Sequence, residues 1–549
     1  MLARCASAAL RGVEALPVTV EVDIGPGLPG LQMVGLGDAA VHESRERVRA
    51  ALRNSGLRPP LTRVVVSLAP ADLRKEGPAF DLPIALGLLM ASGQLPPPRL
   101  EGIWSAAELG LDGRLRPVRG VLALASAARR HGARALIVAR GNAAEAALVE
   151  GLKVWGAASL GEVLALLEDP ASVIPPQTAA VADPPCRGPD LAEVRGQDHG
   201  RRALEIAAAG DHHLLLVGPP GSGKTMLAQR LPGLLPPLGR REALERTLLH
   251  SVAGLLPEGA GLLAGRPFRS PHHGCSAVAL IGGGVLPRPG ELSLAHHGVL
   301  FLDELTEFRR EVLDQLRQPL EQGEVWICRA RQRCRFPCRI TLVAATNPCP
   351  CGWFGDPDHA CLCGESARRR YWRRLSGPLL DRIDLQVVMR RPAPADLADG
   401  YRTARPQEGS AAVAERVRTA RERMRRRNPD GLGNAQMAGL HLQETLRLES
   451  TALDLWERAL GVRRLSPRGG QRVLRVARTI ADLAGREQVQ TGDIAEALTY
   501  RSFDLLEAMA AGSQPAGVSA AAADGRGRAG SPPEEGGAEL PRGDCRRHG

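Results

Sequence analysis

The residues best suited to chemistry form one short stretch of the chain. It consists of Gly218, Pro219, Pro220, Gly221, Ser222, Gly223, Lys224 and Thr225. Its glycines let backbone N–H groups turn inward around phosphates, Lys224 supplies a positive charge for the β- and γ-phosphates, and the Thr225 hydroxyl is a ligand for Mg²⁺. An apolar strand is expected over residues 214–217 and a helix over 226–231, which is the context that this motif requires. The alternative, a glycine-rich turn with an incidental lysine, would not need a strand before it and a helix after it. The stretch predicts a site for ATP and Mg²⁺.

Polar residues follow two further apolar runs. Residues 299–302 are apolar and end at Asp303 and Glu304, about 80 residues after the phosphate-binding stretch. At the carboxyl end of a parallel strand, Asp303 can hold Mg²⁺ and Glu304 can polarise the attacking water. The third run, residues 340–346, ends at Asn347, which can hydrogen-bond the γ-phosphate or the water, or can merely cap the strand.

The composition is that of a folded protein with several domains. The chain has 549 residues, 44% of them hydrophobic and 24% charged, which suggests two to four domains. It has no apolar run of about 18 residues and no secretory signal near its start, so we expect no membrane span and a cytoplasmic location.

The charge of the chain points weakly to nucleic acid. The formal net charge is +11, which favours an acidic partner such as DNA. Almost all basic residues are arginine, however, and together with 62 Gly and 43 Pro this composition is typical of GC-rich codon usage. Aromatic residues make up only 3%, so any DNA contact should be mainly to phosphates.

The order of residue patterns divides the chain into five segments. Short β-type runs at 18–22 and 64–68 and a helical run at 40–54 indicate a mixed N-terminal region, and later strands that alternate with helices indicate a parallel sheet. We expect an N-terminal domain over 1–170, a proline-rich linker over 171–190, a nucleotide-binding core over 191–395, a helical domain over 396–510 and a disordered tail over 511–549.

Four of the eleven cysteines are clustered: Cys349, Cys351, Cys361 and Cys363. Four thiolates suit tetrahedral Zn²⁺, although the C-x-C spacing is tighter than the usual C-x₂-C. The alternative is a loop of reduced thiols. A metal here could stiffen the segment that carries Asn347.

Two basic segments have two interpretations each. Arg269, His272 and His273 could form a pore loop that contacts DNA phosphates, or could pack between subunits. The arginine-rich run at 415–427 could bind DNA, but its interleaved glutamates favour a solvated helix face.

With these strands in order, the chain resembles the AAA+ ATPases of the magnesium-chelatase group and, more narrowly, the ComM/YifB proteins associated with natural competence. The resemblance covers roughly residues 5–505. Its specific segments are GLGDAAVHESRERVRAAL, SLAPADLRKEGPAFDLPIALGLL, RPFRSPHHGCS, PGELSLAHHGVLFLDEL, SGPLLDRIDL and LRVARTIADL. It implies an α/β fold with an N-terminal Lon-protease-like, S5-type α+β domain, a central AAA+ parallel sheet and a C-terminal helical lid.

The resemblance also implies further residues of the site. Arg382 matches the arginine finger that reaches the γ-phosphate bound by a neighbouring subunit, which implies a ring, most simply a homohexamer. The alternative for Arg382 is an ion pair with Asp381 or Asp384. Arg468 matches the second sensor arginine of the lid, and Gln197 lies where the family places the adenine or could be a turn residue.

Four further positions bear on these assignments. Arg472 and Arg475 compete with Arg468 for the sensor role. An active Lon-type protease carries a serine and a lysine where this chain has Ala79 and Leu122, so the N-terminal domain is expected to be catalytically silent and to serve assembly or substrate holding.

Three functions remain open at this stage. The resemblance implies a motor that moves branched DNA, as in branch migration or unwinding. A motor subunit for metal chelation and a nucleotide-switched assembly that remodels proteins are the alternatives, because the motifs themselves do not show the substrate.

Overall fold

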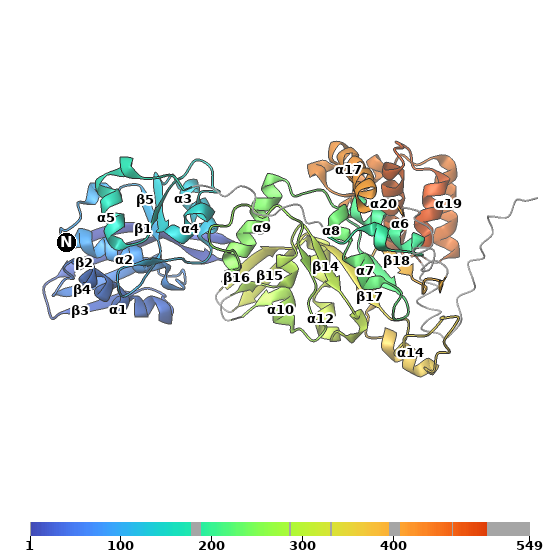
Figure 1. Ribbon diagram of the computed structural model, residues 1–549, viewed down its shortest axis with the longest axis horizontal. Helices are drawn as coiled ribbons and strands as arrows, with labels where there is room; N and C mark the ends of the chain where they lie inside the picture. The colour runs from blue at the N-terminus through green and yellow to red at the C-terminus, as the bar shows by residue number, and fades with distance from the viewer. Residues whose placement is uncertain are drawn as a thin grey trace, which may run out of the picture.

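The computed structural model describes residues 2–176, 188–284, 287–329, 332–394, 407–463 and 465–501. Figure 1 shows three parts along the long axis of the molecule: an N-terminal sheet with helices in blue, a central sheet with helices in green and yellow, and C-terminal helices in orange and red. The sequence-based expectation of an α/β fold with a parallel core sheet and a helical C-terminal region is confirmed.

The N-terminal part is built on a seven-stranded mixed sheet. Its strands, in spatial order, are β3 (Gly30–Val34), β4 (Arg63–Ala69), β2 (Glu14–Gly25), β1 (Leu2–Arg11), β5 (Ile103–Ala106), β8 (Ala135–Ala139) and β9 (Lys153–Ala157). Its helices are α1 (Ala39–Asn54), α2 (Asp81–Ala91), α3 (Val121–Arg130), α4 (Arg140–Ala146) and α5 (Leu160–Glu168), with a small ladder of β6 (Glu108–Leu109) and β7 (Leu115–Arg116). Helix α1 begins where Asp38 accepts a hydrogen bond from the Val41 N–H at 2.9 Å.

The central sheet has five strands that all run parallel. They are, in spatial order, β11 (Phe268–Arg269), β14 (Val299–Leu302), β17 (Thr341–Thr346), β10 (Leu214–Val217) and β18 (Leu385–Val388). Along β10 the residues alternate between two hydrophobic cores: Leu215 and Val217 belong to one, and Leu214 and Leu216 to the other. Both faces of the sheet are therefore buried, which explains why the strands are continuous apolar runs.

Short helices and two hairpins surround the central sheet. The helices are α6 (Asp198–Gly210), α7 (Lys224–Ala228), α8 (Leu231–Leu234), α9 (Arg240–Ala253), α10 (Ala277–Ile281), α11 (Glu291–Leu294), α12 (Arg310–Asp314), α13 (Arg317–Gln322), α14 (Glu365–Trp372) and α15 (Gly377–Leu380). The hairpins are β12 (Gly282–Gly283) with β13 (Arg288–Pro289), and β15 (Glu324–Arg329) with β16 (Gln332–Pro337).

The helix expected over residues 226–231 is wrong in its extent. The structure has α7 and α8 in its place, with a break at 229–230. The buried Arg230 side chain donates to the carbonyl oxygens of Met226 at 2.6 Å and Asp190 at 2.9 Å, and so holds the break. Pro232 then lies near the start of α8, where its missing N–H is tolerated.

The C-terminal part is helical, with α17 (Ser410–Arg427), α18 (Gly439–Leu446), α19 (Ser450–Val462), α20 (Pro467–Leu483) and α21 (Thr491–Thr499). Its interior contains an ionic network, because the almost fully buried Arg478 donates to Asp482 at 2.9 Å. Arg427 also donates to Asp482, at 2.6 and 2.8 Å. Each buried charge is thus paired, as burial requires.

The N-terminal and central parts share one hydrophobic core, in which α3 packs on α9. The buried carboxylate of Glu145 accepts hydrogen bonds from the Leu122 N–H at 3.0 Å, from Asn142 at 3.1 Å and from the hydroxyl of Ser251 on α9. Burial raises the pKa of Glu145. Leu122 is thus buried on α3, the helix that packs against α9 of the central part.

Some expectations fall partly or wholly outside the described residues. These are the linker at 171–190, the segment after 395 and the tail at 511–549, so the domain boundaries remain predictions. In the ranges that the structure describes, no helix has both the length and the apolar character that a membrane crossing needs.

Candidate active site

The phosphate-binding stretch connects β10 to α7 as a loop at the carboxyl edge of the central sheet. Gly221 and Gly223 have φ angles of 78° and 85°, a conformation that suits glycine. The Gly218 N–H donates to the Thr346 carbonyl oxygen of the neighbouring strand β17 at 3.2 Å. The loop is thereby anchored beside the end of the strand that precedes Asn347.

Lys224 lies inside this loop. Its ammonium group donates to the carbonyl oxygens of Gly218 at 2.7 Å and Pro219 at 2.9 Å, and to Oδ1 of Asn347 at 3.3 Å. Burial lowers the pKa of Lys224 to about 8, although nearby carboxylates act in the opposite direction. The structure thus brings Lys224 and Asn347 together.

Asp303 and Thr225 are in direct contact. The Thr225 hydroxyl donates to Oδ2 of Asp303 at 2.8 Å, between the start of α7 and the end of β14. A hydroxyl and a carboxylate at this distance are oxygen donors of the kind that Mg²⁺ takes from proteins next to a nucleotide. The donor set therefore suits Mg²⁺.

Glu304 adopts an unusual backbone conformation and is paired. Its φ is 52°, in the left-handed region, and its N–H donates to Oδ1 of Asp303 at 3.0 Å. Nδ1 of His273, from the loop after β11, lies 3.0 Å from its Oε2. The ring of His273 in turn lies against that of His272, with centroids 4.1 Å apart. One loop residue therefore holds the side chain that was predicted to polarise water.

Arg269, the last residue of β11, is not a free charge either. Arg269 forms two hydrogen bonds of 2.6 Å with the carboxylate of Glu291 on α11. Arg269 and His273 thus both have partners within the chain. These contacts are neither of the two interpretations given for Arg269, His272 and His273. The pore-loop interpretation stays a prediction.

Arg382 pairs with Glu321 of α13, with 2.8 Å between Nη2 and Oε2. The alternative partners, Asp381 and Asp384, pair with other arginines instead. The interpretation of Arg382 as a member of a local pair with either aspartate is wrong for this structure. The reason is geometric, since α13 lies closer to the guanidinium than either neighbouring carboxylate does.

Arg468 lies on the same side of the molecule as Arg382. Its Nη1 is 3.8 Å from Oε1 of Glu321, so one glutamate faces both arginines. Both arginines line a cavity of about 410 Å³, together with Arg472 and Arg475, and no residue of the phosphate-binding loop lines it. The predicted finger and sensor therefore face one glutamate, at a cavity that the phosphate-binding loop of their own chain does not line.

Gln197 is buried at the start of α6. Its amide nitrogen donates to the carbonyl oxygens of Ser222, in the phosphate-binding loop, at 3.0 Å and of Arg390 at 2.6 Å. These bonds brace the loop against the segment after β18. Contact with adenine stays a prediction.

The arginine-rich run at 415–427 belongs to α17. Arg418 pairs with Glu415 and Glu422 one turn away on either side, at 2.5 and 2.6 Å. These exposed pairs support the solvated helix face rather than a DNA footprint.

The four clustered cysteines come together between β17 and α14, with their sulfur atoms within 4.8 Å of one another. They follow Asn347 directly in the chain.

The sequence analysis missed one functional candidate, the hairpin of β15 and β16. Its inward side chains are buried, whereas Trp326 and Arg333 are exposed on its outer face. The Arg333 guanidinium lies 4.3 Å from the centre of the Trp326 ring, and Arg335 pairs with Glu324 at 2.6 Å. The available signal was the apolar run at 325–328, followed by the alternation of arginine with apolar residues at 333–336.

Comparisons with known proteins give matches along most of the chain. Residues 190–397 match the family model for magnesium chelatase, subunit ChlI. Residues 20–142 match the model for subunit ChlI of Mg-chelatase, and residues 407–501 match the model for the C-terminal part of that subunit.

Three relatives are similar over almost their whole lengths. An uncharacterized protein, Rv2897c of Mycobacterium tuberculosis, is 46% identical over 503 residues, which are 91% of this chain and 98% of the relative. The uncharacterized protein YifB of Salmonella typhimurium is 45% identical over 495 residues, 90% and 96% of the two chains. The competence protein ComM of Haemophilus influenzae is 44% identical over 503 residues, 90% and 97% of the two chains.

Proposed function

The chain belongs to the magnesium chelatase ChlI family, in its YifB and ComM group, and from this we propose that it is an ATP-hydrolysing motor of the cytoplasm that forms rings and acts on branched DNA. The family assignment supports the AAA+-type motor activity. The nucleotide site, the ring and the DNA are supported by separate features of the chain.

The site residues divide the hydrolysis reaction among them. Lys224 binds the β- and γ-phosphates of ATP, and Thr225 and Asp303 hold Mg²⁺. Mg²⁺, when bound, neutralises charge on the phosphate oxygens. Glu304 orients and polarises the attacking water, and Asn347, already within 3.3 Å of Lys224, orients the water or the γ-phosphate. The pairing of Glu304 with His273 must open for this role.

One observation supports the proposal of a ring: Arg382 and Arg468 both line a cavity that the phosphate-binding loop does not line. Arginines stabilise the charge of a phosphoryl-transfer transition state only when they reach it. A second subunit whose phosphate loop faces this cavity would meet both arginines. Repetition of such a head-to-tail contact closes a ring, for which we propose six copies.

The hairpin of β15 and β16 supports DNA as the substrate. Arg333, which lies over the Trp326 ring, offers a cation for phosphates beside an aromatic side chain, two kinds of group that sites for single-stranded nucleic acid combine. The net charge of +11 is consistent with it. A relative is named a competence protein, and we accordingly propose that the motor acts on DNA during uptake and recombination.

The N-terminal part contributes no protease chemistry in this proposal. By the resemblance to Lon-type proteases, Ala79 and the buried Leu122 stand where the catalytic serine and lysine would be. Since this part shares a core with the central part, we propose that it serves ring assembly or holds substrate.

The test is ATP hydrolysis with and without single-stranded and branched DNA, with Lys224→Ala as the blank. We expect strong stimulation by DNA. We also expect Arg333→Glu to keep the DNA-free rate and lose the stimulation, whereas Arg418→Glu, a matched change on the paired face of α17, keeps both. A rate of ATP hydrolysis that none of the DNA molecules changes would refute the DNA proposal. It would favour a chelatase motor or a nucleotide-switched assembly.

A further inference from the structure

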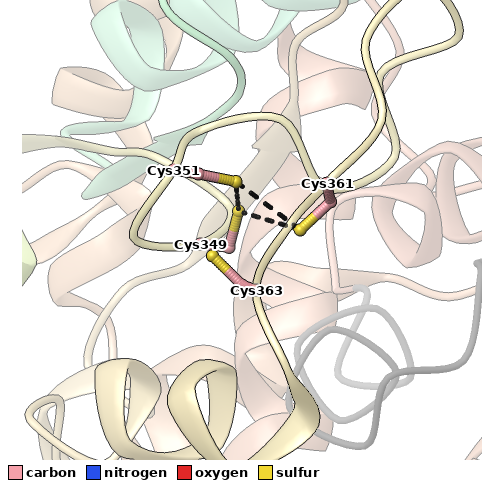
Figure 2. A group of neighbouring side chains, drawn as sticks. All are labelled: Cys349, Cys351, Cys361 and Cys363. Carbon is pink, nitrogen blue, oxygen red and sulfur yellow. Dashed lines mark hydrogen bonds between the residues drawn. The ribbon is translucent and has the colours of Figure 1, made fainter.

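The four sulfur atoms that follow Asn347 form a compact group. Cys349 and Cys351 come from the turn after β17, and Cys361 and Cys363 from the segment before α14. Figure 2 shows all four side chains directed toward one another. The Sγ atoms are 3.3 Å apart between Cys349 and Cys351, and 3.6 Å apart from each of these to Cys361. Including Cys363, all lie within 4.8 Å of one another.

These distances discriminate between kinds of sulfur cluster. Four thiolates around Zn²⁺, each about 2.3 Å from the metal at tetrahedral corners, are about 3.8 Å from one another. A disulfide requires about 2.05 Å. The observed separations are close to the edge of the zinc tetrahedron and far longer than an S–S bond. The cluster therefore has the size of a Cys₄ metal site.

The surroundings leave four sulfur ligands and no open position. His359, the nearest imidazole in sequence, pairs with Asp356 at 3.2 Å and stacks on Trp353 with ring centres 4.2 Å apart, so its ring is engaged elsewhere. The segment is held by Arg368, which donates to the Cys363 carbonyl oxygen at 2.6 Å. A closed set of four thiolates is typical of structural rather than catalytic zinc.

The geometry points to a structural Zn²⁺ bound by Cys349, Cys351, Cys361 and Cys363, which fixes the loop that positions Asn347 at the phosphate-binding loop. Cys349 is two residues from Asn347. Gly352, inside the cluster loop, approaches the phosphate loop so closely that an added Cβ would lie 2.8 Å from the ring of Pro220. The ion thus holds the loop at two places next to the nucleotide. The positioning of Asn347 rests on the proposed function, but the metal site does not.

The metal is tested on the full chain, purified without chelator. We expect about one zinc per chain by elemental analysis, since the four ligands form one site. Zinc should be released when a mercurial reagent titrates the thiols, and the cobalt-substituted protein should show a thiolate-to-cobalt charge-transfer band. Absence of zinc, together with absence of that band, would overturn the inference without any variant.

The link to the nucleotide is tested with Cys361→Ala, and with Cys5→Ala, a buried cysteine of β1, as the matched control. Cys361→Ala should lose zinc and lower kcat by up to about 100-fold through displacement of Asn347, because a 1 Å shift can cost that much. Cys5→Ala should keep both. Zinc loss with unchanged kcat and KM would refute the positioning role. A zinc-loaded protein that hydrolyses no ATP would refute the proposed function and leave the metal site standing.

Discussion

The arrangement of Arg382 gives a quantitative prediction for mixed rings. In its own chain Arg382 forms an ion pair of 2.8 Å with the half-exposed Glu321, and Arg382→Ala removes that pair at a stability cost of about 1 kcal/mol or less. The folded chain tolerates such a loss. If Arg382 serves the neighbour's site, the variant ring should lose about 10³-fold or more in kcat while it still binds ATP.

Lys224→Ala removes the other half of the same composite site. A ring of this variant alone should not hydrolyse ATP, because no phosphate loop in it is intact. In an equal mixture, a boundary is competent when an Arg382→Ala subunit supplies the phosphate loop and a Lys224→Ala subunit supplies the arginine. Random assortment makes about one quarter of boundaries competent.

The assay is steady-state hydrolysis of each pure variant and of the exchanged mixture, with subunit exchange verified by fluorescence transfer between labelled chains. The mixture should regain about one quarter of the wild-type rate per subunit, when boundaries act independently. A mixture as inactive as its parts, despite verified exchange, would refute the reasoning. The arginine would then act within its own chain. The mixture would stay inactive in that case, because none of its subunits has both Arg382 and Lys224.

Three further predictions concern single residues. His273→Ala removes the partner of Glu304, a pair of partly exposed groups worth up to about 1 kcal/mol, so DNA-free kcat should rise by up to about fivefold with KM unchanged; a fall in kcat would contradict this. Burial lowers the pKa of His213 to about 4. Near the ordinary pKa of histidine the unfolded chain takes up a proton on this residue and the folded chain does not. The free energy of unfolding should therefore fall as pH drops from about 6.5 toward 4, by up to about 1.4 kcal/mol per pH unit. In denaturant titrations the free energy of unfolding should fall less steeply with pH in His213→Gln than in the wild type. Equal slopes would exclude His213 as a source of the pH dependence. Arg478→Met removes a buried partner of Asp482 and should lower the free energy of unfolding by about 3 kcal/mol, measured by denaturant titration; a change below about 1 kcal/mol would contradict the pairing.

The proximity of the residues of the proposed nucleotide site was largely predictable because its parts are local. Lys224 and Thr225 follow an apolar strand within one short loop, and Asp303 and Asn347 each follow another apolar strand. Carboxyl ends of parallel strands meet at one edge, so finding the strands places these side chains together. The boundaries were less predictable, as the break between α7 and α8 depends on the distant contact between Arg230 and Asp190.

Features that depend on long-range packing could not be predicted. The pairing of Arg382 with Glu321 joins the turn after α15 to α13, far apart in the sequence, and the two nearby aspartates were the obvious but wrong partners. The contact of His273 with Glu304 likewise follows from the position of β11 next to β14 in the sheet. The hairpin with Trp326 carried a local signal, the period-two alternation at 333–336, but its first strand contains a continuous apolar run at 325–328 without that period.

The most direct test is ATP-driven movement of a four-way DNA junction by the wild-type chain and by Glu304→Gln. The wild type should convert the junction into two duplexes with ATP and Mg²⁺, and should fail with a non-hydrolysable analogue. Glu304→Gln should bind ATP and the junction without moving it, because water is not activated. Hydrolysis by the wild type without any junction movement, or movement unaffected by Glu304→Gln, would contradict a hydrolysis-driven DNA motor.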